Sequence, residues 1–177
     1  MDNKKEKNPL IDKFLSHLFD CRDTDNLIIK GHILTEHALH FYIEMKAVEK
    51  VDFKKVKFTY SNKIEIAKLF GLFKNDPQLY NELKQLNKLR NSIAHRLKHD
   101  DKILTEFLKG FNRYKSAFGS DRVNLDKDEE VFYEIEQEKI TVTGAHMTLM
   151  FYISAICMKI FGSIRERKEI NTVPNKT

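Results

Sequence analysis

The sequence predicts a single, mainly α-helical domain with one small β-hairpin placed before its C-terminal helix. Apolar residues recur at intervals of three and four along most of the chain, which is the spacing of amphipathic helices. Leu, Lys, Glu and Ile are plentiful, and the 177 residues include only three prolines, a composition that favours helix. Strict apolar–polar alternation occurs in one short region, residues 130–143. Hydrophobic residues make up 41% and charged residues 32% of the chain, as in globular proteins.

The first two expected helices cover residues 10–19 and 24–51. Residues 1–9 are charged and lack an apolar segment, so we expect a flexible tail and no secretory signal. The second helix is long, and its apolar side chains recur at helical spacing: Leu27, Ile28, Leu34, Ala38, Leu39, Phe41, Tyr42 and Met45. A connector over residues 52–60 follows.

Capping residues predict where the next two helices begin. Ser61 is the expected N-cap of a third helix that ends near Gly71 and carries the apolar residues Ile64, Ala67, Leu69 and Phe70. Asp76 then caps a fourth helix, because an aspartate followed by a proline in the first turn is a strong helix start. Pro77 opens this helix, which reaches about Leu97.

A fifth helical stretch is expected over residues 103–118, before the period changes. Residues 131–136 and 139–143 alternate in polarity, so they predict the two strands of the hairpin. We expect its turn at Gln137 and Glu138.

The last expected helix runs from residue 144 to about residue 167, with Thr143 as its cap. Its most apolar part, residues 147–158, is shorter than the roughly 20 residues that span a bilayer. We therefore expect no membrane association and a cytoplasmic protein. The single domain is expected over residues 10–168, followed by a flexible tail over residues 169–177.

The two cysteines indicate a reducing environment and no metal site of their own. Cys21 and Cys157 lie far apart and form no metal-binding pair. We expect two free thiols, as in cytosolic proteins.

Charge is unevenly distributed along the chain, although the formal net charge is only +5. Residues 84–102 contain six basic residues against Asp100 and Asp101, whereas residues 120–138 contain eight acids against two basic residues. A basic segment of this kind is suited to a polyanion such as RNA. The alternative is that it is simply a solvated helix face.

Within this basic segment, residues 86–95 read Leu-Asn-Lys-Leu-Arg-Asn-Ser-Ile-Ala-His. Arg90 can stabilise charge on a phosphate, and His95 can transfer a proton near neutral pH, which are two requirements of a metal-free ribonuclease. At 100° per residue, Asn91 and His95 share a face nearly opposite the apolar stripe formed by Leu79, Leu83, Leu86, Leu89, Ile93 and Leu97.

Arg90 itself falls within that apolar stripe. Because an unpaired buried charge is costly, Arg90 either pairs with a carboxylate inside the bundle or lies at the edge and reaches outward. Glu36 is the first candidate partner, followed by Glu44 and Glu65. A purely structural arginine–glutamate pair is the alternative to a catalytic role.

The pattern Arg-polar-x-x-x-His resembles the signature of the HEPN superfamily, which comprises all-helical ribonucleases, RNA-binding modules and toxin components. Residues 31–39, 58–64 and 86–95 together resemble the mannitol-repressor-like branch, in which a glycine and an acid on a long helix precede an Arg-Asn-x-x-Ala-His segment. Glu36 would be the supporting acid. The resemblance covers residues 31–97, under half of the chain.

The resemblance implies RNA cleavage by attack of a ribose 2′-hydroxyl on phosphorus, without a metal or other cofactor. His95 would act as general acid or base, Arg90 would stabilise the phosphoryl oxygens, and Asn91 would orient one of them. We expect Lys88, Arg96 and Lys98 to bind the RNA backbone.

In such ribonucleases two copies face each other, so the resemblance implies a homodimer or pairing with a related HEPN chain. It suggests a bacterial toxin or anti-phage effector with an antitoxin or regulatory protein as partner. The alternatives are a non-catalytic HEPN regulator or RNA-binding scaffold, and a helical subunit of a larger defence complex.

One weaker cluster lies on the second helix, where His32, His37 and His40 accompany Glu36. Two histidines three residues apart can share a metal, but the sequence offers no evident third ligand. We expect these histidines to pack on the helix face and to bind no metal.

Overall fold

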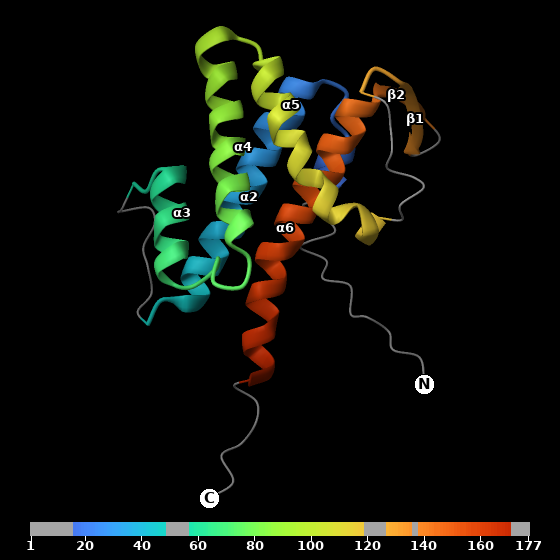
Figure 1. Ribbon diagram of the computed structural model, residues 1–177. Coiled ribbons are helices and arrows are strands. Elements are labelled where there is room, and N and C mark those ends of the chain that lie inside the picture. The colour runs from blue at the N-terminus through green and yellow to red at the C-terminus, as the bar shows by residue number, and fades with distance from the viewer. Residues whose placement is uncertain (1–15, 49–56, 119–126, 136–137, 171–177) are drawn as a thin grey trace, which may run out of the picture.

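The computed structural model describes residues 16–48, 57–118, 127–135 and 138–170, and its helices pack side by side around one hydrophobic core (Figure 1). The predicted class, mainly α with a small hairpin before the C-terminal helix, is confirmed. In chain order the elements are α2 Thr24–Lys46, α3 Tyr60–Leu69, α4 Pro77–Arg96, α5 Asp101–Lys109, the 3₁₀ segment η1 Gly110–Phe118, β1 Glu130–Ile135, β2 Glu138–Thr143 and α6 Gly144–Ile170.

Helices α2 and α6 form the centre of the bundle and approach each other closely at Gly31. A Cβ atom at this position would overlap Cδ1 of Ile153, which is fully buried on α6. The two helices run in the same direction, and α4 runs the opposite way beside them (Figure 1). Glycine at this crossing therefore sets the distance between the two central helices.

His146 fastens the start of α6 to the segment that begins α2. Its Nε2 lies 2.9 Å from the carbonyl oxygen of Cys21, and its Nδ1 lies 3.2 Å from Oγ1 of Thr24. Since a carbonyl only accepts, Nε2 carries the proton and Nδ1 of the neutral ring accepts from the threonine hydroxyl.

Helix α4 buries the stripe that its apolar spacing predicts over most of its length. Leu79, Leu83, Leu86 and Leu89 are buried and Ile93 is half-buried. Leu97 is the exception, because it is 90% exposed and has a φ of 59°. The helix ends there in a left-handed turn, so the last member of the predicted stripe points to solvent.

Capping explains where α3 and α4 begin. Asp76 caps α4 as predicted, since its Oδ1 accepts from the backbone N–H of Leu79 at 3.3 Å. The predicted cap of α3 is wrong: the helix begins at Tyr60 after Thr59, not after Ser61. Thr59 is the cap because it forms a capping box with Asn62, in which each side chain accepts a hydrogen bond from the other residue's backbone N–H at 3.2 Å.

The ends of several elements differ from the sequence prediction. Helix α2 ends at Lys46, before residues 49–56, which lie outside the described residues, as do residues 1–15 and 171–177. Only residues 16–19 of the expected first helix are therefore described, and they are helical. Helix α6 continues to Ile170, so two residues assigned to the flexible tail are helical.

The expected single helix over residues 103–118 is divided at Gly110 into α5 and η1. A side chain at Gly110 would overlap the phenol of Tyr152 on α6. The chain therefore changes from α to 3₁₀ geometry where it must pass a large buried ring.

An ionic network joins η1 to the first half of α4. Arg113 donates to both carboxylate oxygens of the buried Glu82, at 2.6 and 2.7 Å, and to Oδ1 of Asp76 at 2.6 Å. Tyr114 donates to Glu82 at 2.8 Å. Burial by itself would lower the pKa of Arg113, but its bonds to Glu82 and Asp76 outweigh that effect and raise the pKa.

Strands β1 and β2 pair antiparallel, and β2 begins one residue earlier than the sequence predicts. Ile135 lies opposite Glu138, which therefore belongs to β2 and not to the turn. This register keeps Ile140 and Val142 buried on the core side. Thr143 caps α6 as predicted, because its Oγ1 accepts from the backbone N–H of His146 at 3.2 Å.

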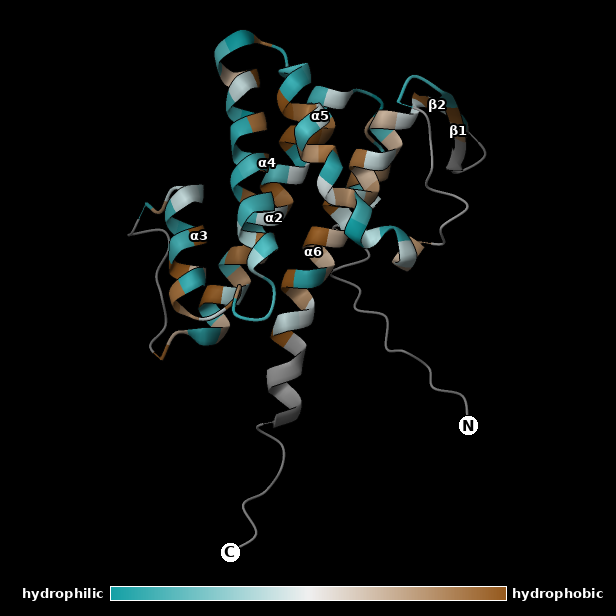
Figure 2. Cartoon of the chain, in the orientation of Figure 1, coloured by the Kyte–Doolittle hydropathy of each residue, from teal (hydrophilic) through white to brown (hydrophobic). Residues whose placement is uncertain are grey.

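Helix α6 contains a longer apolar stretch than residues 147–158. Among the described residues, Gly144–Ile164 is the one stretch long and apolar enough to cross a membrane by length and composition. Within the fold, more than half of its most apolar part is buried. Figure 2 shows apolar residues along the part of this helix that packs in the bundle.

Both cysteines are buried free thiols, as the sequence predicts. Burial raises the pKa of Cys157 to about 12. This thiol therefore stays protonated and behaves as a small apolar side chain.

Stability should fall as the pH drops below the ordinary histidine range. Burial lowers the pKa of both His32 and His146 from 6.5, so the unfolded chain binds more protons below that pH. The free energy of unfolding should be constant above about pH 6.5 and then decrease by at most about 1.4 kcal/mol per pH unit for each histidine. Urea unfolding between about pH 7.5 and pH 5.5 measures this, and a flat profile contradicts it.

Replacing Gly31 with alanine should destabilise the fold. The added methyl group overlaps Ile153 in a packed core, so we expect a loss of about 1–3 kcal/mol in unfolding free energy. Gly162→Ala on α6 is the matched control, because a Cβ there meets nothing within 4 Å. That variant should gain up to about 1 kcal/mol from helix propensity. Equal effects of the two substitutions in thermal or urea unfolding would contradict the close α2–α6 approach.

Candidate functional site

The last two turns of α4 present the predicted catalytic residues to solvent. Arg90, Asn91 and His95 are all exposed, while Ser92 and Ile93 between them are half-buried and hold the helix against the bundle. Figure 2 shows mostly hydrophilic residues at this end of α4 and in the turn that leads to α5. The three side chains are therefore accessible to a large ligand.

Arg90 lies at the edge of the apolar stripe and reaches outward. Its Nη1 is 3.4 Å from Oδ1 of Asn91, the neighbouring residue on the exposed face. Of the two alternatives that the sequence left open, burial against a carboxylate is wrong and the outward position is correct.

Glu36 is not the partner of Arg90. Its Oε1 accepts from Nζ of Lys63 on α3 at 2.8 Å, so the supporting role predicted for it must be corrected. The two weaker candidates are also engaged elsewhere: Glu44 lies 3.1 Å from His40, and Glu65 accepts from the hydroxyl of Tyr80 at 2.7 Å. Over the described ranges, no carboxylate comes within ion-pair distance of the Arg90 guanidinium.

A polar contact that the sequence analysis missed lies one turn before Arg90. His32 on α2 is only 7% exposed and donates from Nε2 to Oδ1 of Asn87 at 3.1 Å. The Asn87 amide in turn donates to Ser61 on α3 at 3.1 Å, and the centroid of the His32 ring lies 3.9 Å from that of the Tyr60 ring, with the two rings tilted by 30°. Three helices thus meet at one hydrogen-bonded chain.

The electrostatics of His32 link this contact to the exposed site. Burial is the main cause that lowers its pKa, and the positive charge of Arg90 lowers it further. The sequence gives one indication of this contact: His32 and Asn87 are polar residues that each border a buried apolar stripe, on α2 and on α4. This indication does not identify the two residues as partners.

The acidic side chains near the turn after α4 already have hydrogen-bond and ion-pair partners. Asp25 accepts from the backbone N–H of His99 at 3.0 Å and lies 2.5 Å from its Nδ1. Asp100 accepts from Arg96 at 2.7 Å, and the backbone N–H of Ile103 is the main cause that lowers its pKa. The acids next to the basic segment are therefore neutralised by their own neighbours.

Several cationic side chains remain at this end of the protein. Lys88 and Lys98 are exposed and, within the part of the chain that the structure describes, they form no ion pair. On the helix wheel, Lys84, Lys88, Asn91 and His95 fall within about 60° of one another. We call these four residues, together with Arg90, the α4 stripe. Arg96, which was predicted to bind RNA as well, is tied to Asp100.

The α2 histidines do not converge on a common point. His32 is bonded to Asn87, and His40 lies 3.1 Å from Glu44. A search of the described residues finds no group of three or more His, Cys, Asp or Glu side chains with the geometry of a metal site.

The chain was compared with protein families, curated proteins and solved structures. None of them matches. The chemistry of the site is therefore argued from its own residues.

The α4 stripe combines a guanidinium, a side-chain amide and one imidazole, which are groups that can contact a phosphodiester. An exposed guanidinium and a side-chain amide 3.4 Å apart can hold phosphoryl oxygens. His95 lies in the last turn of α4 and is exposed. Transesterification needs both a base and an acid, and the stripe of one chain holds a single histidine.

Removing the exposed site residues should leave the fold intact. Arg90→Ala and His95→Ala should each change the free energy of unfolding by no more than about 0.5 kcal/mol, because both side chains are exposed. Asn87→Ala should lower it by about 1–3 kcal/mol, since it leaves the buried N–H of His32 without an acceptor. Urea unfolding separates these outcomes. A collapse of the Arg90→Ala variant would instead assign that arginine a structural role.

Proposed function

We propose that this protein is a metal-independent endoribonuclease of the HEPN type. The observation that supports the proposal is the joint exposure of Arg90, Asn91 and His95 on the last two turns of α4, with the guanidinium directed to Asn91. The local excess of basic residues suits the phosphate backbone of RNA, since lysine and arginine contacts dominate affinity for nucleic acids.

In this proposal the ribose 2′-oxygen attacks the adjacent phosphorus and the bond to the 5′-oxygen breaks, leaving a 2′,3′-cyclic phosphate. A neutral His95 takes the proton of the attacking hydroxyl, and a protonated imidazole gives a proton to the departing 5′-oxygen. Arg90 stabilises the charge that develops on the phosphoryl oxygens. Lys88 and Lys98 hold neighbouring phosphates, and no metal takes part in any step.

The two imidazoles come from two chains. Each chain supplies one His95 on the exposed end of α4, so a homodimer, or a pair with a related HEPN chain, completes the base and the acid. Leu97 follows α4 directly and is 90% exposed, so it can form an apolar contact between the two chains.

The proposed setting is the cytoplasm of a bacterium, where the enzyme acts as a toxin or anti-phage effector on cellular or phage RNA. An antitoxin or other regulatory protein would then hold it inactive. The two buried free thiols are compatible with a reducing compartment.

A non-catalytic HEPN regulator or RNA-binding scaffold is the second candidate. It is favoured by the surroundings of His95, because no side chain among the described residues is hydrogen-bonded to the imidazole to orient it. Catalytic histidines usually have such a partner. In a scaffold, the α4 stripe would bind RNA or a partner protein without cutting it.

Incubation of purified protein with single-stranded RNA in excess EDTA tests the enzyme proposal. Cleavage is expected to persist, and the 5′ fragments should end in cyclic phosphate. Arg90→Ala and His95→Ala should each lower the rate by at least about 100-fold, which is typical for loss of a general acid–base or charge-stabilising group. His37→Ala, which removes an exposed histidine on α2, should cut at the wild-type rate.

Intact RNA with retained RNA binding would support the scaffold and exclude the ribonuclease. Light scattering on the same sample checks the composite site. A dimeric mass is expected, and full activity of a monomer would contradict the two-chain arrangement.

A further inference from the structure

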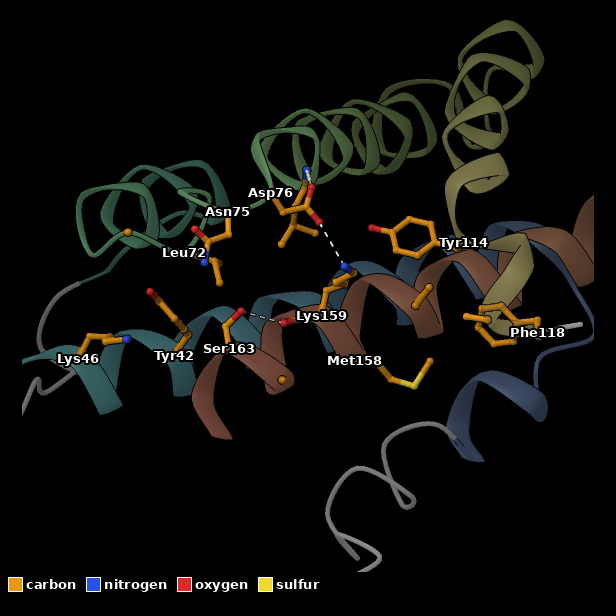
Figure 3. A pocket seen from close by; sticks show the side chains of 15 residues that line it. Tyr42, Lys46, Leu72, Asn75, Asp76, Tyr114, Phe118, Met158, Lys159 and Ser163 are labelled. Atoms are coloured by element: carbon orange, nitrogen blue, oxygen red, sulfur yellow. Dashed lines mark hydrogen bonds and ion pairs between the residues drawn. The ribbon is translucent and has the colours of Figure 1, made fainter. Parts of the chain in front are cut away.

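The loop between α3 and α4 borders two hollows, and Gly71 lines both of them. One is a cavity between α2, α4, η1 and α6, in which Asp76 is ion-paired with Lys159 (Figure 3). The other has a volume of about 440 Å³ and lies between the end of α3 and the start of α4. We call it the α3–α4 hollow, and its lining residues are Lys68, Gly71, Phe73, Lys74, Pro77, Tyr80 and Asn81.

The α3–α4 hollow is cationic. Lys68 and Lys74 are exposed, the lining includes no acidic residue, and within the described ranges neither lysine forms an ion pair. Lys84 adds a third ammonium group, 3.3 Å from the hydroxyl of Tyr80. The nearby acid is Glu65, which accepts from the same hydroxyl at 2.7 Å. Three lysines against one glutamate leave a local excess of positive charge.

An aromatic ring lies between these lysines. Nζ of Lys68 is 4.7 Å and Nζ of Lys84 is 5.0 Å from the centroid of the Tyr80 ring. Tyr80 is half-buried, and its ring packs edge-on against the buried Phe73 with a centroid distance of 5.4 Å. The ring therefore keeps two ammonium groups close to one another at the surface.

The α3–α4 hollow continues the face that carries the α4 stripe. Lys84 belongs to the stripe and also contacts Tyr80. On the helix wheel, Tyr80 falls within about 80° of each of the five α4 stripe residues. His95 follows Tyr80 by 15 residues, which is about 22 Å along a helix. One cationic face thus runs from the hollow, past the exposed Lys88, to the residues proposed to cut RNA.

A strand of phosphates matches this face better than a small anion does. A small anion would occupy one pair of lysines, whereas a nucleic acid strand carries one negative charge per nucleotide along its whole length. At about 3.4 Å per phosphate in a stacked strand, a distance of about 22 Å corresponds to about six nucleotides. A cationic path that includes an aromatic side chain is also typical of surfaces that bind single-stranded nucleic acids.

We propose that the α3–α4 hollow is a second binding subsite for single-stranded RNA, about six nucleotides along the strand from the bond at Arg90 and His95. Lys68 and Lys74 bind the distant phosphates, and Lys84 and Lys88 bind those between. This inference rests on the proposed function, because the other end of the strand lies at the proposed cleavage site. It requires that the α4 stripe binds RNA, and it holds whether or not the RNA is cut.

Binding of a labelled single-stranded RNA of about 12 nucleotides to the full chain, measured by fluorescence anisotropy over a range of salt concentrations, tests the subsite. The double variant Lys68→Gln/Lys74→Gln should bind about tenfold more weakly. Its plot of log affinity against log salt concentration should be less steep by about 1.4, because each phosphate contact on a single strand contributes about 0.7.

Lys30→Gln/Lys109→Gln is the matched control. It removes the same charge from two exposed lysines on α2 and α5, so it should keep the affinity and the salt dependence of the wild type. Circular dichroism should show that both double variants are folded, since all four lysines are exposed.

Substrate length separates the subsite from the cleavage site. A trinucleotide covers about 10 Å when stacked, so one that is bound at Arg90 does not reach the hollow. Lys68→Gln/Lys74→Gln should therefore lower kcat/KM for the long RNA by about tenfold and leave kcat/KM for the trinucleotide unchanged. Arg90→Ala should lower both.

Equal RNA affinities of Lys68→Gln/Lys74→Gln and its control would overturn the subsite while leaving the ribonuclease proposal in place. Conversely, a wild type that binds RNA without cutting it, and binds more weakly only when the hollow is changed, would exclude the ribonuclease and support the subsite. Displacement of the RNA by poly-glutamate as readily as by unlabelled RNA would assign this face to acidic proteins. Failure of the wild type to bind RNA would overturn both proposals.

Discussion

The close approach of α2 and α6 at Gly31 is the constraint on which the rest of the structure depends. Because Gly31 has no side chain, Ile153 of α6 packs directly against the backbone of α2. His146 fixes the position of α6 along α2 through its bonds to Cys21 and Thr24. Helix α4 packs on α2, while α5 and η1 pack on α6. The exposed end of α4 and the cavity at its start are therefore both positioned by this central pair.

Most of the helices were predictable because apolar spacing records which face of each helix is buried. The caps Asp76 and Thr143 were predictable for a different reason, because a cap depends only on a few neighbouring residues. The errors have two different causes. At α3 two neighbouring residues could each cap the helix, and the reciprocal bonds between Thr59 and Asn62 select Thr59. The break at Gly110 is explained by Tyr152, which is distant in sequence and lies on another helix.

The helical wheel places the proposed site residues Asn91 and His95 on the exposed face of α4, as the structure has them, but it does not give the contacts of the site. A helical wheel places Arg90 near the apolar stripe, but only the packing of Leu86 and Leu89 against neighbouring helices decides that the arginine stays outside. Sequence also cannot rank the possible partners of Glu36, which takes Lys63 because α3 lies next to α2. The bond between His32 and Asn87 was missed because neither residue alone has an unusual pattern.

The bond between Thr24 and His146 spans 122 residues of the chain, and this separation has a consequence for biosynthesis. When α2 leaves the ribosome, α6 has not yet been translated, so the face of α2 that packs on α6 stays uncovered even after α3 and α4 have been made. The nascent chain must keep that face from aggregating until α6 emerges. The core is then completed only when the last helix joins the earlier ones.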